Sequence, residues 1–172
     1  MVQRSKEKSP ARENGLIRVL FLIYLLFLFW AVLWKFNMPY IGDGTLRHIN
    51  VTPFQGNTLS EMRFNILVFM PFGLYISMLA PKRAFAVRVC LALLCSALFE
   101  VLQYALAIGR SDITDLILNT LGGVAGMAFF SLLSRLLGKK APKALRGVCV
   151  AVTVLVLAVA GFFVLRGRIR IV

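Results

Sequence analysis

Long blocks of apolar residues alternate with short polar segments along this chain. Five such blocks are present, at about residues 16–36, 64–80, 84–108, 113–137 and 147–165. A helix needs about 20 apolar residues to cross a bilayer core of about 30 Å, and these blocks approach or exceed that length. The pattern therefore predicts an all-α protein, a polytopic integral membrane helix bundle with about five transmembrane helices.

The polar segments divide the chain into three predicted parts. Residues 1–15 form a basic tail, residues 16–137 hold the first four helices, and residues 138–172 hold a basic loop, the fifth helix and a basic tail. The first apolar block is too long for the core of a signal peptide, and no small-residue cleavage site follows it. We expect it to be an uncleaved signal anchor. The longest connection, residues 37–63, contains several Pro and Gly residues and should be irregular backbone at the membrane surface.

Composition and charge agree with a membrane location. Hydrophobic residues make up 59% of the chain and the mean hydropathy is +0.82, whereas a typical soluble domain is about half apolar. The net charge of +13 comes mainly from Lys and Arg in the tails and turns, where such residues contact anionic lipid head groups. We therefore expect no nucleic-acid partner. Cys90, Cys95 and Cys149 lie inside apolar segments and predict no disulfide framework.

The distribution of the cations predicts the orientation of the bundle. With a cytoplasmic N-terminus, thirteen of the 20 Lys and Arg residues fall on the inner side. Cytoplasmic loops carry the excess of Lys and Arg in membrane proteins. We therefore expect a multi-pass protein of the plasma membrane with its N-terminus in the cytoplasm.

Polar residues in the third and fourth apolar blocks fall on defined helix faces. Glu100 and Gln103 are three residues apart and share one face. The short connection at 109–112 brings that face close to the start of the fourth helix. There a 3-4-3-4 spacing places one further set on a single stripe: Asp112, Asp115, Asn119, Gly122 and Gly126.

This hairpin predicts a single outward-facing polar pocket near one membrane surface. Asn65, at the start of the second helix, enters the membrane at the same level, and the loop before it lies on the same side. The predicted pocket residues are Asn50, Pro53, Phe54, Asn65, Glu100, Gln103, Arg110, Asp112, Asp115 and Asn119.

Glu100 needs a partner, because an acidic residue at the centre of a membrane helix costs about 2.5–3.5 kcal/mol. Arg110 is the nearest cation across the hairpin, and we hypothesise a Glu100–Arg110 ion pair. Asp112 or Asp115 would cap the fourth helix, where a carboxylate complements the helix dipole. Taken singly, each of these polar residues could instead serve only to tie helices together.

Other residues predict close packing of the helices. Pro71 removes one backbone hydrogen bond from the second helix, and the freed carbonyl must find a partner inside the bundle. Gly122 and Gly126 form a GxxxG pair, with Gly123 beside it, at which another helix can approach closely. Together with Gly73, these residues form the predicted packing set.

Catalysis and metal binding have weaker support in the sequence. The chain has no nucleophile motif, phosphate-binding loop or zinc-protease signature. His48 is its single histidine, and we expect no metal site and no cofactor. The alternative is a membrane enzyme in which Glu100 and Asp115 act as acid and base, because burial raises a carboxyl pKa toward neutrality.

Several sequence blocks carry a family resemblance: NVTPF at 50–54, NILVFMPFG at 65–73, FEVLQ at 99–103 and AIGRSDITDLILNTLGG at 107–123. In order and spacing they resemble the VanZ-like family over residues 16–137. The residues that match the family's characteristic polar positions are Glu100, Gln103, Asp112, Asp115 and Asn119.

The resemblance implies low-level resistance to teicoplanin in a bacterial plasma membrane, by a route that leaves the peptidoglycan precursor unaltered. Teicoplanin is lipid-tailed and acts on precursors at the outer leaflet, on the side where the predicted pocket opens. Two hypotheses follow. In the first, a non-enzymatic protein binds a membrane lipid, a lipid-linked cell-wall precursor or teicoplanin. In the second, a membrane enzyme modifies an envelope lipid or glycan.

Overall fold

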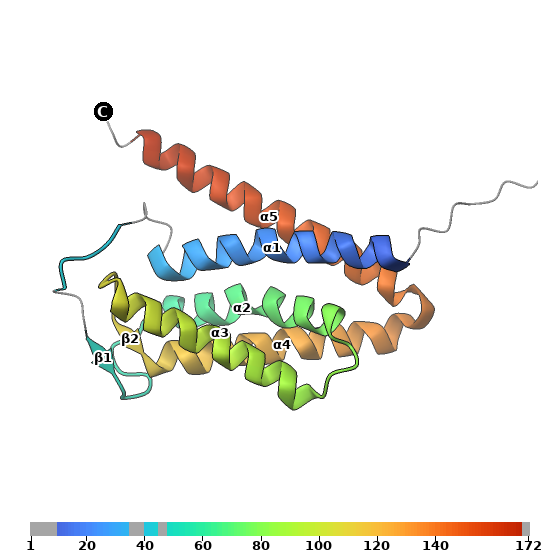
Figure 1. Cartoon of the computed structure of the whole chain (residues 1–172), viewed down its shortest axis with the longest axis horizontal. Helices are drawn as coiled ribbons and strands as arrows, with labels where there is room; N and C mark the ends of the chain where they lie inside the picture. Colours follow the sequence, from blue (N-terminus) through green and yellow to red (C-terminus); the bar gives the residue numbers. More distant parts are fainter. Residues whose placement is uncertain (1–9, 35–39, 45–47, 170–172) are drawn as a thin grey trace, which may run out of the picture.

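The computed structural model describes residues 10–34, 40–44 and 48–169, with side chains for 15–34, 40–44 and 48–166. Helices make up most of this part of the chain, and its two strands have two residues each, so the predicted all-α fold class is confirmed. The elements follow in chain order (Figure 1): α1 Pro10–Trp34, β1 Ile49–Asn50, α2 Leu59–Leu79, α3 Phe85–Ala105, β2 Ser111–Asp112, α4 Ile113–Leu137, the short 3-10 helix η1 Gly138–Lys140 and α5 Ala141–Ile169.

Four stretches of helix in the described part of the chain are long and apolar enough to cross a membrane, where the sequence predicts about five. The first three are Gly15–Trp34, α2 and α3. The fourth, Ile113–Arg166, is a continuous helical stretch of 54 residues that contains α4, η1 and α5. The predicted count is corrected to four because helical turns continue through the segment expected to be a basic loop. The chain nevertheless reverses its direction at η1 (Figure 1).

The helices lie where the sequence predicts, but three of them, α1, α2 and α5, begin five or six residues before the predicted start. α4 begins and ends where the sequence predicts. α2 begins at Leu59, more than one turn before the predicted start, because Thr58 and Glu61 form a capping box. In it the Thr58 hydroxyl accepts the Glu61 N–H and the Glu61 carboxylate accepts the Thr58 N–H. α5 begins at Ala141, so the cations after it lie on helical turns.

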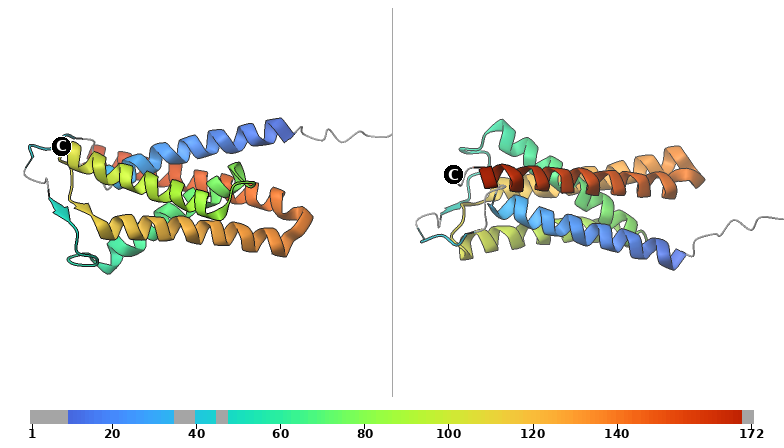
Figure 2. Two further views of the ribbon diagram at one scale, coloured as in Figure 1. Left: turned by 60° about the horizontal axis from the view of Figure 1, so that its bottom comes forward. Right: turned by 90° about the horizontal axis from the view of Figure 1, so that it is seen from above.

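The helices run lengthwise beside one another, so the bundle has two ends (Figures 1 and 2). α2 and α4 both start at the end that holds β1 and β2, and they are parallel neighbours. We call this the strand end; it comprises residues 40–44, the two strands, the last turns of α3 and the first turns of α2 and α4. The opposite end, the turn end, comprises the turn at residues 80–84, η1 and the adjoining helix turns.

Glycines allow α2 and α4 to approach closely. A Cβ atom on Gly73 would overlap the backbone carbonyl of Gly123, and one on Gly126 would overlap the carbonyl of Met70. Gly122 faces the backbone of α2 in the same way. The α2–α4 contact is accordingly the most extensive one between helices in the described structure, as is usual where small residues let helix backbones meet.

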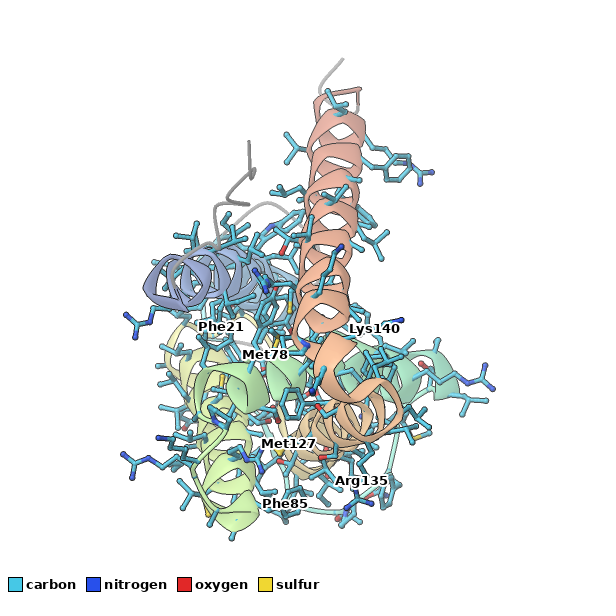
Figure 3. The ribbon with its side chains drawn as sticks, turned by 90° about the vertical axis from the view of Figure 1, so that its right-hand side faces the viewer. Phe21, Met78, Phe85, Met127, Arg135 and Lys140 are labelled. Carbon is cyan, nitrogen blue, oxygen red and sulfur yellow. The ribbon has the colours of Figure 1, made fainter. Side chains whose placement is uncertain are left out.

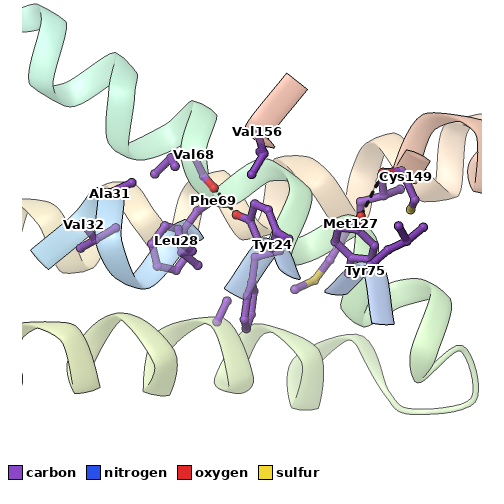
Figure 4. Packing of buried hydrophobic residues seen from close by; sticks show 14 of the residues in the cluster. Tyr24, Leu28, Ala31, Val32, Val68, Phe69, Tyr75, Met127, Cys149 and Val156 are labelled. Carbon is purple, nitrogen blue, oxygen red and sulfur yellow. Dashed lines mark hydrogen bonds between the residues drawn. The ribbon is translucent and has the colours of Figure 1, made fainter. Parts of the chain in front are cut away.

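Aromatic and aliphatic side chains from α1, α2, α4 and α5 form much of the buried core (Figure 4). The Tyr24 hydroxyl donates to the Val68 carbonyl of α2, and the Tyr75 hydroxyl donates to the Cys149 carbonyl of α5 at 3.0 Å. Pro71 lies between these two contacts, and α2 continues through it. Each buried hydroxyl thus joins two helices in surroundings that offer no water as a partner.

Candidate ligand-binding site

A short parallel pairing joins the loop before α2 to the connection between α3 and α4. Ile49 pairs with Ser111 and Asn50 pairs with Asp112. The Ser111 N–H also donates to the His48 carbonyl at 3.0 Å. These bonds hold a loop from the first half of the chain directly beside the start of α4.

Asp112 is the centre of the hydrogen-bond network at the strand end. Its side chain is 3% exposed and caps α4, because Oδ1 accepts the Thr114 N–H at 2.9 Å. Its Oδ2 accepts the Asn50 amide at 3.0 Å and the Arg110 guanidinium at 2.8 Å. A buried carboxylate is stable only with such partners. Asp112 therefore fixes the loop, the α3–α4 connection and α4 to one another.

The surroundings of Asp112 keep its carboxyl group ionised. Burial by itself raises the pKa of this group, but hydrogen bonds from Asn50 and Thr114 and the positive charge of Arg110 outweigh burial. The pKa of Asp112 is therefore lower than its ordinary value of 3.8. A carboxylate bound in this way on both oxygens acts as a structural anchor and is a poor proton donor at neutral pH.

Glu100 lies on α3 and contacts the backbone of Asp112. Its Oε2 accepts the Asp112 backbone N–H at 2.7 Å, and its backbone carbonyl accepts the Ser111 hydroxyl at 2.8 Å. The ion pair of Arg110 is with Asp112 rather than with Glu100, the partner hypothesised from the sequence. The reason is local: Arg110 is two residues from Asp112 and reaches its carboxylate while staying 44% exposed. Glu100 holds the backbone at the start of α4.

Further side-chain hydrogen bonds join the helices next to this network. The Asn65 amide donates to Asp115 Oδ1 at 2.6 Å, between α2 and α4. The Asn119 amide donates to the Ser96 hydroxyl at 3.0 Å, between α4 and α3. The Gln103 amide donates to a backbone carbonyl of α1 at 3.1 Å. Polar groups from four helices therefore meet near the strand end, and α3 and α4 are neighbours there.

A cavity of about 640 Å³ opens at the strand end. One part of its wall is apolar or aromatic, formed by Leu33, Trp34, Tyr40, Phe64 and Ile108. The other part consists of Gly56, Gly109 and nine polar residues. The polar residues are His48, Asn57, Ser60, Glu61, Asn65, Gln103, Arg110, Asp112 and Asp115. A single chamber therefore offers both hydrocarbon-like and polar surfaces to a ligand.

Half of the residues predicted for the pocket line this cavity, and the other half lie around it. Asn50 and Glu100 bond to Asp112, and Asn119 is fully buried between α3 and α4. The predicted residues in the cavity wall are Asn65, Gln103, Arg110, Asp112 and Asp115.

Pro53 and Phe54 lie on the exposed loop before α2. The Phe54 N–H donates to the Thr114 hydroxyl at 2.8 Å, which attaches the loop to the first turn of α4. Phe54 and Gly56 have φ angles of 63° and 78°, in the left-handed region that tight turns require. All three residues shape the loop; Pro53 and Phe54 are not part of the cavity wall, whereas Gly56 is.

Sequence reasoning missed several lining residues. Trp34 and Tyr40 close one side, where the Trp34 indole donates to the Tyr40 carbonyl at 2.9 Å. Ser60 and Glu61 lie on the first turn of α2, and the Thr-x-x-Glu capping-box pattern before the apolar block would have placed Glu61 at this level. His48 comes just before β1, and no sequence signal marks it as a wall residue.

The cavity is rich in hydrogen-bond acceptors. Three carboxylates line it, against one imidazole and one guanidinium, and that guanidinium is already paired with Asp112. Gln103 Oε1 and Asn57 Oδ1 are buried acceptors with no hydrogen-bond partner among the described residues. A ligand that donates hydrogen bonds through hydroxyl, amide or ammonium groups would satisfy them. In the same part of the chain, no three His, Cys, Asp or Glu side chains are grouped to hold a metal ion.

The apolar helices and the polar cavity at one end define a multi-pass membrane protein with a candidate site near one membrane surface. The family model described as VanZ/LLP1 matches residues 21–134. The chain is also 35% identical over 128 residues to Protein VanZ of Enterococcus faecium, an alignment that covers 73% of this chain and 80% of the relative. The chain belongs to the VanZ/LLP1 family, which confirms the resemblance seen in the sequence. No solved structure matches it.

Proposed function

We propose that this protein is a non-enzymatic membrane protein that lowers sensitivity to teicoplanin by binding an envelope molecule. Membership of the VanZ/LLP1 family supports the link to teicoplanin resistance. The observation that carries the binding mechanism is the mixed lining of the cavity, in which carboxylates and buried amide acceptors share one chamber with an aromatic and aliphatic wall.

The ligand we propose is amphipathic and has a polar head that donates hydrogen bonds. A lipid-linked cell-wall precursor carries sugar hydroxyls and peptide N–H groups beside a hydrocarbon chain, and acyl-tailed teicoplanin carries the same combination. Sites for small molecules measure about 300–1,000 Å³, so a cavity of about 640 Å³ accommodates one sugar or a short peptide portion of either molecule. The apolar wall suits the beginning of the lipid chain.

The proposed orientation puts the cavity at the outer membrane surface. The turn at residues 80–84 and the η1 turn both carry cations, and such turns stay in the cytoplasm. The strand end is then on the outside of the membrane, where teicoplanin acts on peptidoglycan precursors. A cytoplasmic N-terminus follows, because α1 begins at the turn end.

The first experiment is expression of the chain in a susceptible Gram-positive host. We expect the minimum inhibitory concentration of teicoplanin to rise, and that of vancomycin, which has no acyl tail, to change much less. An immunoblot of the membrane fraction establishes that the protein is present. Well-expressed protein with no teicoplanin shift would contradict the proposal.

The role of the cavity is tested with two matched aspartate variants. Asp115→Asn removes a charge from the cavity wall and keeps an oxygen that can accept from Asn65. Asp43→Asn makes the same change at an exposed position of the strand end that does not line the cavity. We expect Asp115→Asn to lose the teicoplanin shift and Asp43→Asn to keep it, at equal expression. Equal resistance in both variants would exclude the cavity as the site.

The enzymatic alternative makes a different prediction for Glu100→Gln. If Glu100 were an acid or base, the variant would lose activity, because an amide does not transfer protons. In the binding mechanism, the amide oxygen of the variant side chain still accepts the Asp112 N–H, so the teicoplanin shift should remain within about twofold, the step of the dilution series. A complete loss in stable, well-expressed protein would favour the enzyme.

Binding to purified protein separates the two ligand sources. Wild type and Asp115→Asn are placed in nanodiscs and titrated with teicoplanin or with lipid-linked precursor. A candidate ligand that binds wild type more tightly than it binds Asp115→Asn is identified as the ligand of the cavity. If teicoplanin and the precursor each bind wild type and Asp115→Asn with equal affinity, the cavity is not the binding site.

A further inference from the structure

Gln103 brings a buried, unsatisfied acceptor to the wall of the strand-end cavity. Its side chain is 3% exposed and lies in that wall. The amide nitrogen donates to the Val32 carbonyl of α1 at 3.1 Å, which fixes the orientation of the amide group. The other amide atom, Oε1, has no hydrogen-bond partner in the part of the chain that the structure describes. A buried carbonyl oxygen without a donor is costly, so a ligand that supplies one gains affinity.

Many of the hydrogen-bond donors of the cavity wall already bond to the protein itself. The Trp34 indole donates to the Tyr40 carbonyl, and the Tyr40 hydroxyl donates to the Ile108 carbonyl at 3.3 Å. The Asn65 amide and the Arg110 guanidinium donate to aspartates at the start of α4. Among the described residues, the two buried wall atoms left without a partner are both amide oxygens. The wall therefore requires more donors from a ligand than it offers in return.

This balance favours a hydroxyl group over a peptide group or an ammonium group next to Gln103. A peptide group brings one carbonyl with each N–H, and that carbonyl needs a donor of its own. A hydroxyl donates one hydrogen bond and rotates to direct it. An ammonium group would have to be buried near Leu33 and Ile108, where a charge costs far more than a neutral hydroxyl.

Aromatic side chains supply an apolar surface close to the same acceptor. Trp34 lies two residues after Val32, the residue of α1 to which Gln103 donates. Tyr40 and Phe64 belong to the same cavity wall. The face of an aromatic ring is negative and attracts the C–H groups on one face of a sugar ring, while the hydroxyls at the edge of the sugar remain available for hydrogen bonds.

We infer that the cavity recognises its ligand through a sugar. Gln103 Oε1 accepts a hydrogen bond from a sugar hydroxyl, and Trp34 and Tyr40 pack against the sugar ring. This inference rests on the proposed function and narrows its ligand from donors of hydrogen bonds in general to a sugar joined to a hydrocarbon chain. The lipid-linked precursor and teicoplanin, which is a glycopeptide, are two sources of such a group.

A smaller cleft at the turn end lacks this combination of groups. It measures about 360 Å³ and lies between α1, α2, α4 and α5. Figure 3 looks onto the turn end and labels Met78, which belongs to the wall of the cleft. The polar side chains of that wall are Ser134 and Arg146. Within the described residues, no buried acceptor without a partner lines it. The features that suit a sugar are therefore specific to the strand end.

The test compares probes that share one lipid and differ in the head group. Protein in nanodiscs is titrated with undecaprenyl pyrophosphate, with the same lipid carrying one N-acetylglucosamine, and with the complete precursor, which also carries the peptide. Teicoplanin is the fourth probe. Trp30→Phe leaves Trp34 as the single tryptophan of the chain, so its emission reports events at the cavity wall.

In this background we expect the lipid with one sugar to bind at least about tenfold more tightly than the bare lipid, because its hydroxyl satisfies a buried acceptor. The peptide of the complete precursor should add less than about twofold. Gln103→Met keeps the length of the side chain and removes the acceptor, so the preference for the sugar should be lost. Gln55→Met makes the same change at an exposed position outside the cavity wall and should keep it. If teicoplanin is the source of the sugar, its binding shows this dependence on Gln103 in place of the lipid's.

The comparison of bare and sugar-bearing lipid needs no variant at Gln103, so it holds even if Gln103→Met is unstable. Equal binding of these two lipids, together with teicoplanin binding that is the same in Gln103→Met and Gln55→Met, would overturn the inference. A gain that requires the peptide would also overturn it. Asp115→Asn separates this failure from that of the proposed function. If Asp115→Asn weakens binding and Gln103→Met does not, the cavity is the site and only the sugar inference fails. If neither variant weakens the binding of any probe, both fail.

Discussion

The two ends of this bundle differ in how their polar and charged side chains are buried and paired. At the strand end, carboxylates and amides are mostly buried and hydrogen-bonded to one another, as in the network around Asp112. At the turn end, the described cations are mostly exposed, and Arg146 lines a mostly apolar cleft. Buried groups need fixed protein partners, whereas exposed cations have lipid head groups and water.

This difference indicates which end of the bundle can bind a ligand selectively. At the strand end, most polar side chains around Asp112 are oriented by hydrogen bonds to one another, so this end can present a fixed pattern of acceptors to a ligand. The turn end has long, flexible side chains that recognise charge but little shape. A selective site is therefore expected at the strand end.

The largest effect is expected from the contact that holds α2 against α4 and supports the strand end. Gly126→Leu would drive a side chain into the carbonyl of Met70, so we expect a loss of at least about 1–3 kcal/mol in stability or a failure to accumulate. Gly161→Leu on α5, where nothing lies within 4 Å of an added Cβ, is the control. Membrane-fraction yield and Tm in detergent are measured for both. Similar values for the two variants would show that the glycine contact is not tightly packed.

A smaller but clear effect is expected at the centre of the strand-end network. Asp112→Ala removes the α4 cap and the carboxylate that accepts from both Asn50 and Arg110, and we expect a cost of about 2–3 kcal/mol. Thr58→Ala removes the cap of α2, which is exposed, and should cost about 1 kcal/mol or less. Chemical or thermal unfolding in detergent measures the difference. Equal losses would mean that burial of the Asp112 network adds no stability.

The strand end should also be the acid-sensitive one. The pKa of Asp112 is lowered in the folded protein, so its ionisation stabilises the fold above its ordinary pKa of 3.8. That contribution is lost as the pH falls below 3.8 through the folded-state pKa. Tm measured from pH 6 downward should fall more steeply for wild type than for Asp112→Asn, which cannot ionise. Parallel curves would contradict the assigned role of the carboxylate.

The smallest effect concerns a single hydrogen bond between helices. Ser96→Ala removes the acceptor of the Asn119 amide, and an interhelical bond of this kind contributes about 0.6 kcal/mol on average. Ser131→Ala removes a hydroxyl that bonds within α4, to the Met127 carbonyl, and should leave Tm unchanged. If the Tm of Ser96→Ala falls no further than that of Ser131→Ala, the hydrogen bond between α3 and α4 makes no measurable contribution to stability.

The sequence predicts the parts of this structure that depend on local periodicity. The bounds of α4 follow from an apolar block that begins after a capping aspartate. Asp112 and Asp115 both line the cavity, although Asp112 is the extended N-cap residue and lies outside the helix. Family membership could likewise be inferred from linked sequence blocks.

The rest depends on how the backbone folds between the helices. The sequence predicts a pair between Arg110 and Glu100 across the hairpin, but Arg110 pairs with Asp112, which is two residues away. Trp34 and Tyr40 line the cavity together because residues 40–44 lie against the end of α3, where the Gly42 N–H donates to the Leu106 carbonyl. The η1 turn keeps its helical hydrogen bonds although its composition is that of a basic loop. No periodic pattern in the sequence encodes such loop paths.

The central claim is that the cavity at the strand end faces the outside of the cell. Single cysteines are introduced at Ser60, in the cavity wall, and at Lys140, at the turn end, in a chain whose Cys90, Cys95 and Cys149 are replaced by Ala. Intact cells are treated with a membrane-impermeant maleimide. The account predicts that position 60 is labelled at once and position 140 only after the membrane is permeabilised. The reverse pattern would put the cavity in the cytoplasm and contradict the proposed mechanism.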